Sequence, residues 1–224
     1  MKWVVGKDHF LKVDRNINRI RLGSNYGGWF ICPDVLSSKL KVNVISIGIG
    51  RDITFDLALI EMFGATVHAF DPTPLSIEWV NSQALPKGLY THQIGIAAAE
   101  GEIEFGLPLK DGWDSYSAFN KSRGSVRCPV TTLNGILEIA GSREIDIFKM
   151  DIEGSEFEVI DEMSFNDFRP GQILVEFHYN SDAVSKTHID TISRVEKLRN
   201  IGYSVFDVSP WGREFSLIRN DLVN

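Results

Sequence analysis

Four polar side chains end two apolar runs in the second half of the chain. Asp151 and Glu153 follow the run Ile145–Met150, and Glu176 and His178 end the run Gln172–Phe177. Residues two apart in an extended chain point to the same face, so each pair shares a face. A carboxylate or an imidazole placed in this way can remove a proton from a hydroxyl group. The spacing therefore predicts two polar strand ends, which form one acid–base site if the two strands are neighbours.

The sequence does not decide which residue of this site is the base and which residues orient it. Either His178 or Asp151 is the base, and Glu153 and Glu176 orient the base or the acceptor. The set Asp151, Glu176 and His178 is also competent to bind Mg²⁺ or Mn²⁺, although a metal is not the favoured interpretation. The structural alternative is a salt-bridged strand end without chemistry, in which Lys149 pairs with a carboxylate.

A second group of residues has the spacing of a nucleotide site. Gly48-Ile49-Gly50 follows an apolar strand and precedes a helix, so its free N–H groups can face a ligand. Asp71 ends the next strand about 20 residues later, which is the distance that places an acid on ribose hydroxyls. A dinucleotide fold needs a third glycine at position 53, and Ile53 stands there. The pattern favours a nucleoside ligand without a pyrophosphate and disfavours a nicotinamide oxidoreductase.

Strand and helix patterns alternate through most of the chain. Strands are predicted over 41–50, 65–71, 89–94, 126–130, 145–151 and 172–178, and helices over 53–63, 73–82, 133–140, 155–163 and 182–199. A hairpin over 203–208 and 215–219 closes the chain. This alternation predicts an α/β fold with a mostly parallel sheet, helices on both faces and an antiparallel edge. We expect a single domain over 1–224, with an N-terminal arm and glycine-rich turn over 1–40 and the core over 41–224.

Several local features lead to further expectations. Ser155 and Glu158 have the spacing of a capping box at a helix start. The segment 95–105 is expected to be a short excursion, and the aromatic-containing loop 107–125 is expected to cover the acceptor. Gly27 and Gly28 either admit a ligand close to the main chain or form a plain hairpin turn. Asp52 either binds a ligand ammonium group or favours the helix dipole.

Composition limits the partners. The chain of 224 residues is 43% hydrophobic and 24% charged, with a formal net charge of −7 and no basic block. This charge argues against nucleic acid or an anionic membrane as the main partner. No apolar run is long enough to span a membrane and no signal peptide is evident, so we expect a soluble, cytoplasmic protein. The oligomeric state stays open.

Two motifs carry a resemblance to a known family. The run DIFKMDIEGSE at 146–156, followed by ILVEFH at 173–178, resembles the FkbM family of S-adenosylmethionine-dependent methyltransferases. Thr132-Leu133 and Phe70-Asp71-Pro72 are similar to two further family elements. Ser46 stands where the first family motif commonly has Asp. The segments GGW at 27–29, GIGRD at 48–52 and FDPT at 70–73 look more like a methyltransferase-like branch.

The resemblance implies a Rossmann-like class I methyltransferase fold with a seven-stranded sheet. It implies S-adenosylmethionine as cofactor and O-methylation of a small molecule, sugar or natural product. The alternatives are a metal-dependent catechol-type O-methyltransferase and a ligand-binding module without turnover. Transferred to this chain, the cofactor-binding residues are Gly48, Ile49, Gly50, Asp52, Asp71, Pro72, Gly95 and Ile96, and the catalytic residues are Asp151, Glu153, Glu176 and His178.

Overall fold

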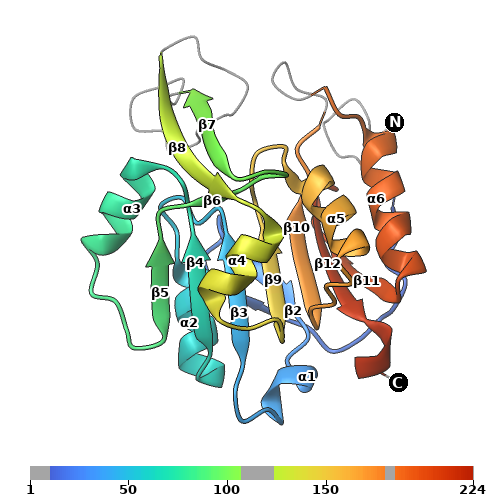
Figure 1. Cartoon of the computed structure of the whole chain (residues 1–224). Coiled ribbons are helices and arrows are strands. Elements are labelled where there is room, and N and C mark those ends of the chain that lie inside the picture. Colours follow the sequence, from blue (N-terminus) through green and yellow to red (C-terminus); the bar gives the residue numbers. More distant parts are fainter. Residues whose placement is uncertain (1–10, 107–123, 180–184, 224) are drawn as a thin grey trace.

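A mostly parallel sheet forms the centre of the molecule (Figure 1). The computed structural model describes residues 11–106, 124–179 and 185–223. Its seven-stranded sheet has the order β11-β12-β10-β9-β3-β4-β5. The strands are β3 (Asn43–Ile47), β4 (Thr66–Phe70), β5 (Leu89–His92), β9 (Ile147–Met150), β10 (Gln172–Glu176), β11 (Tyr203–Val208) and β12 (Glu214–Arg219). The strands β10 to β5 run parallel, and β12 is antiparallel to both neighbours, as the sequence predicts.

The connections leave the sheet at its centre in two directions. From β3 the chain moves outward to β4 and β5, and it later returns to β9 on the other side of β3 before reaching β10. A reversal of strand order opens a crevice beyond the carboxyl ends of the central strands. The condition that the strands of 145–151 and 172–178 are neighbours is met, because Met150 and Val175 are partners in register.

Helices cover both faces of the sheet. Figure 1 shows α4 (Leu133–Ala140) and α5 (Glu156–Phe165) in front of the sheet and α2 (Thr54–Phe63) behind it. Neighbouring strand residues alternate between the two cores: Phe148 packs in the cluster that contains Phe157, whereas Ile147 packs in the cluster that contains Leu59. The remaining helices are α1 (Asp34–Ser37), α3 (Pro74–Asn81), α6 (His188–Asn200) and the 3₁₀ turn η2 (Asn220–Leu222). No helix among the described residues is long and apolar enough to cross a membrane.

The excursion expected over 95–105 is a small sheet. Its strands β6 (Gly95–Ile96), β8 (Ser125–Thr131) and β7 (Gly101–Gly106) lie in that order. The sequence of β7 alternates polar and apolar residues from Glu102 to Phe105, but Ile103 and Phe105 are only partly buried, and the run is short. Most of the predicted acceptor-covering loop, residues 107–123, lies outside the described residues.

The N-terminal arm is attached to the sheet through side chains. Its strands β1 (Ile20–Leu22) and β2 (Trp29–Ile31) form a hairpin. The buried Gln172 amide accepts from the N–H of Cys32 at 2.8 Å and donates to its carbonyl at 3.1 Å. Ser216 Oγ donates to the carbonyl of Phe30 at 2.8 Å. These bonds hold β2 and the residue that follows it against the sheet.

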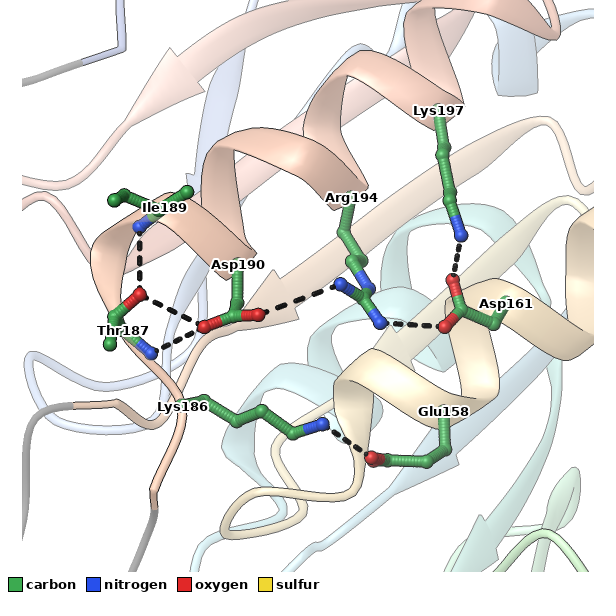
Figure 2. Close-up of polar contacts among 8 residues, drawn as sticks. All are labelled: Glu158, Asp161, Lys186, Thr187, Ile189, Asp190, Arg194 and Lys197. Atoms are coloured by element: carbon green, nitrogen blue, oxygen red, sulfur yellow. Dashed lines mark hydrogen bonds and ion pairs between the residues drawn. The ribbon is translucent and has the colours of Figure 1, made fainter.

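The predicted capping box at Ser155 is wrong. Ser155 has helical backbone angles and its side chain makes no capping bond, while Glu158 forms an ion pair with Lys186 at 2.8 Å. A capping box exists instead at Thr187 and Asp190, where α6 begins, which is later than the predicted start at 182 (Figure 2). The same figure shows Asp161 of α5 held by Arg194 and Lys197 of α6. Glu158 is thus engaged with Lys186, which precedes α6, and does not complete a capping box at the start of α5.

The central strand supplies a test of the core. Phe148 is fully buried, so Phe148→Ala is expected to lower the free energy of unfolding by about 3–5 kcal/mol, through lost burial and a cavity. Phe165 at the end of α5 is 89% exposed, so Phe165→Ala is the matched control and should change it by less than about 0.5 kcal/mol. Chemical denaturation measures both values, and equal losses in the two variants would contradict this description of the core.

Two histidines on β4 and β5 make the fold sensitive to acid. His68 Nδ1 lies 3.0 Å from His92 Nε2, and burial lowers the pKa of both side chains. A lowered pKa in the folded state means that stability is present above the unfolded pKa of about 6.5 and is lost as the pH falls. The free energy of unfolding should therefore drop more between pH 8 and pH 5.5 in the wild type than in a His68→Gln/His92→Gln variant. Identical losses in the two proteins would refute this.

Candidate active site

A cavity of about 810 Å³ lies beyond the carboxyl ends of the central strands. Its walls come from the segments that follow β3, β4, β9 and β10, together with the β1–β2 turn and the β11–β12 turn. All of the residues that the sequence singles out line this cavity: Gly48, Ile49, Gly50, Asp52, Asp71, Pro72, Gly95, Ile96, Asp151, Glu153, Glu176 and His178. The fold therefore brings the two predicted groups to one place.

Close contact between two strand ends shapes the Gly48–Gly50 turn. Gly48 has φ +76°, and a Cβ atom there would lie 1.7 Å from the carbonyl oxygen of Asp151, so only glycine fits. A Cβ atom on Gly50 would meet nothing within 4 Å. The Lys149 ammonium group donates to the carbonyl of Gly48 at 2.5 Å and to that of Ile47 at 3.4 Å. The lysine predicted to pair with a carboxylate thus caps the end of β3 instead.

Asp71 is a buried carboxylate held by local donors. Its Oδ2 accepts from the N–H of Gly50 at 3.0 Å, and its Oδ1 accepts from the N–H and the hydroxyl of Thr73 at 2.9 and 2.6 Å. Burial raises its pKa, and these hydrogen bonds oppose that effect. A carboxylate offers about four acceptor positions, so three bonds leave capacity for about one further donor.

Asp52 ties the start of α2 to the glycine-rich turn. Its Oδ1 accepts from the N–H and hydroxyl of Thr54, and its Oδ2 accepts from Ser24 Oγ at 2.5 Å. Burial works against the charge, but the hydrogen bonds from Ser24 and Thr54 outweigh it and lower the pKa of Asp52. Arg21 donates to the carbonyls of Ser24 and Gly28 in the same turn. A Cβ atom on Gly27 would lie 2.8 Å from Asp52 Oδ2, and one on Gly28 would lie 2.4 Å from the carbonyl oxygen of Ser24, so packing within the protein already requires glycine at both positions. The hairpin turn is thus observed, and it also lines the cavity.

Four carboxylates surround the His178 imidazole. Glu156 Oε1 lies 2.6 Å from Nδ1, and the Glu156 side chain is fully buried. On the other side of the ring, Nε2 lies 3.7 Å from Glu153 Oε2, 3.8 Å from Asp151 Oδ1 and 3.9 Å from Glu176 Oε1. One ring nitrogen is therefore fixed by a buried partner, and the other faces the cavity among three acids.

The charges of this cluster act on each other. Burial alone lowers the pKa of His178, but the hydrogen bond and charge of Glu156, with the charges of Glu153 and Asp151, raise it to about 10. Burial, followed by the charge of Asp151, raises the pKa of Glu176 to about 7. Burial also raises the pKa of Glu153. An imidazolium among acids is the form that this arrangement stabilises.

Glu153 reaches the cluster through a turn. β9 ends at Met150, so the two-residue alternation does not extend to Glu153. Its φ of +55° lies in the left-handed region, which costs a non-glycine residue about 1–2 kcal/mol. This backbone conformation, followed by Gly154, brings the Glu153 carboxylate beside Asp151 and His178. Strained backbone of this kind is common where a side chain must face a ligand.

Sequence reasoning missed other residues of the site. Glu156 lies behind the His178 ring and is not on the cavity wall, and its proximity to His178 depends on how α5 packs on β10. Glu214 lines the cavity and stands directly opposite Glu176 in the antiparallel pair of β10 and β12. The predicted strand over 215–219 begins just after Glu214, so the sequence carried no signal that placed Glu214 in the cavity. Arg51 and Trp211 also line the cavity.

The chain is similar to known methyltransferases in sequence. The profile of the methyltransferase FkbM domain matches residues 13–205. The probable methyltransferase-like protein 24 of Rattus norvegicus is 26% identical over 158 residues, which cover 67% of this chain and 38% of the rat protein. The chain thus matches less than half of the length of that relative.

Solved structures share the architecture at low identity. The methyltransferase domain of METTL16 superposes with a TM-score of 0.50 and 11% identity, covering 86% of this chain and 65% of that chain. A putative rRNA-methylase from Clostridium thermocellum gives a TM-score of 0.48 and 8% identity, covering 83% of this chain and 92% of that chain. The fold is that of Rossmann-like class I methyltransferases. With the profile match over most of its length, the chain belongs to the FkbM methyltransferase domain family.

Proposed function

We propose that this methyltransferase uses S-adenosylmethionine and methylates a hydroxyl group on a small molecule, sugar or natural product. The observation that carries the proposal is the shared cavity. The Gly48–Gly50 turn and Asp71 line one part of it, and the carboxylates around His178 line another. A donor and an acceptor bound in one enclosed space can be aligned for an in-line displacement.

The residues at the Gly48–Gly50 turn fit the cofactor. The open side of Gly50 gives a ligand access to the main chain. Ile49 and Ile96 are buried apolar residues of the cavity wall and suit an adenine ring, and Asp71 Oδ2 has capacity for one ribose hydroxyl rather than the two expected from spacing. Arg51 Nε is buried without a hydrogen-bond partner among the described residues and suits the cofactor carboxylate. The cofactor, when bound, supplies a methyl group on a sulfonium.

The acidic cluster fits the acceptor. His178 is hydrogen-bonded to Glu156 on one side of its ring and faces Glu153 at 3.7 Å on the other, so its role is to orient the acids through its charge. Asp151, Glu153 and Glu176 accept no hydrogen bond from a described residue, so each has the capacity to take the proton of a hydroxyl. Asp151 and Glu176 lie at the ends of β9 and β10, whereas Glu153 lies in the turn beyond β9. We assign the base to this pair and an orienting role to Glu153. The proton moves from the acceptor oxygen to a carboxylate oxygen as the oxygen attacks the methyl group.

Cofactor binding is tested through Asp71. Asp71→Asn removes the charge that accepts the ribose hydroxyl and should weaken binding of S-adenosylhomocysteine about tenfold or more, as expected for a charged hydrogen bond. Isothermal titration calorimetry measures this affinity. Asp167→Asn is the control, because Asp167 lies outside the cavity and Asn tolerates its φ of +52°. Unchanged affinity in Asp71→Asn would count against the cofactor site.

The acceptor end is tested by turnover. Asp151→Asn and Glu176→Gln should each lower kcat, by about 10²- to 10⁴-fold for whichever acts as the base, with S-adenosylhomocysteine affinity kept. Glu158→Gln is the control, since Glu158 pairs with Lys186 on the helical side. The assay follows methyl transfer to a panel of sugars, phenols and an RNA oligonucleotide. RNA should not react, because the acidic cluster repels phosphates.

The same assay separates the proposal from its alternative. Cofactor binding without transfer to any acceptor on the panel would favour a ligand-binding module on a methyltransferase fold. Transfer that survives loss of both Asp151 and Glu176 would refute the assigned base. Transfer to RNA alone would overturn the small-molecule acceptor.

A further inference from the structure

We propose that Asp151, Glu153 and His178 bind a divalent cation at the acidic end of the cavity, with Glu176 at the border of the site. The ligand atoms would be one carboxylate oxygen from each acid and Nε2 of the imidazole, whose proton would be released to solvent as the ion binds. These atoms all lie within 4.8 Å of one another. The binding claim stands on this cluster alone, and the catalytic use of the ion rests on the proposed function.

The spacing of the cluster suits an ion better than direct contact. Nε2 lies 3.7 Å from Glu153 Oε2 and 3.8 Å from Asp151 Oδ1, which is too long for hydrogen bonds. Two atoms bound to one ion at about 2.0–2.2 Å are separated by about 3–4.4 Å. The three groups therefore surround a space of the size that one cation fills.

A second observation comes from behind the ring. Glu156 is fully buried, and its Oε1 accepts from the N–H of Gly154 at 3.1 Å and contacts His178 Nδ1 at 2.6 Å. Metal-binding histidines commonly donate their other ring N–H to a carboxylate, which fixes the tautomer and the ring orientation. Glu156 Oε2 is buried and has no hydrogen-bond partner among the described residues. Burying a carboxylate with one oxygen unsatisfied costs free energy. A role in holding the His178 ring accounts for this cost.

Apart from the His178 imidazole, the cluster receives no cation from the part of the chain that the structure describes. No described lysine or arginine forms an ion pair with Asp151, Glu153 or Glu176, and no described residue donates a hydrogen bond to their carboxylates. Of the other cations on the cavity wall, Arg21 donates to carbonyls of the β1–β2 turn and Lys149 to carbonyls at the end of β3, and Arg51 forms no ion pair with these acids. A bound dication would supply the missing positive charge.

The donor set indicates the kind of ion. Two carboxylates alone suit Mg²⁺, Ca²⁺ or Mn²⁺, whereas an imidazole favours first-row transition metals over Mg²⁺ and Ca²⁺. We therefore expect Mn²⁺ to bind more tightly than Mg²⁺. At the acceptor end, such an ion would lower the pKa of an acceptor hydroxyl, which is the chemistry that the proposed function requires.

Mn²⁺ titration of the metal-free full chain tests the site without cofactor or acceptor. Electron paramagnetic resonance of free Mn²⁺ and calorimetry should show one ion per chain, and Mg²⁺ should compete weakly. Glu153→Gln and His178→Asn should weaken Mn²⁺ binding at least tenfold, and Glu156→Gln should weaken it about 10- to 100-fold through the ring. Glu158→Gln, a carboxylate outside the cavity, should leave it unchanged.

Binding of S-adenosylhomocysteine and thermal unfolding report whether each variant is folded. Glu153 lies in a partly exposed turn, so Glu153→Gln keeps the test open if His178→Asn does not fold. The site is refuted if the wild type binds no Mn²⁺, or if a folded Glu153→Gln variant binds it with wild-type affinity. Mn²⁺ binding without methyl transfer would keep the site and remove the proposed function. Methyl transfer that persists in a chelator, without Mn²⁺ binding, would do the reverse.

Discussion

The contact between Gly48 and the carbonyl of Asp151 is the constraint on which the cavity depends. Parallel strands β3 and β9 lie side by side, and their chains leave the sheet toward opposite sides. Because a side chain at position 48 would collide with that carbonyl, the two exits can be this close only with glycine there. The contact joins the turn that suits a cofactor to the acids that suit an acceptor, so both face one space.

Buried charged groups around this contact are held in three different ways. Lys149 is held by main-chain carbonyls, Asp71 by main-chain and hydroxyl donors, and Glu156 by an imidazole. Simple ion pairs would let each charge neutralise a partner without fixing its direction. Directed hydrogen bonds fix the orientation of each group, which favours a preorganised site over added stability.

The sequence specified the sheet and the polar strand ends because both depend on local periodicity. Apolar runs such as 172–177 and the Gly-x-Gly turn with Asp71 follow rules that act within a few residues, and the structure agrees with them. Glu156 and Glu214 were not predicted because their neighbours in space are set by helix packing and by the long-range pairing of β12 with β10. Ser155 has the spacing of a cap, but its side chain makes no capping bond. At this helix start the Glu156 carboxylate instead accepts from the N–H of Gly154 and contacts His178 Nδ1.

The two acidic parts of the cavity differ in how many hydrogen bonds the protein donates to their carboxylates. Asp52 and Asp71 receive hydrogen bonds from neighbouring N–H and hydroxyl groups, so the protein itself balances most of their charge. Asp151, Glu153 and Glu176 face one imidazole and receive no hydrogen bond from a described residue. Mutual repulsion between carboxylates this close lowers the stability of the fold, so the cluster is not explained by stability. An unbalanced cluster on a cavity wall is therefore best explained by what binds there.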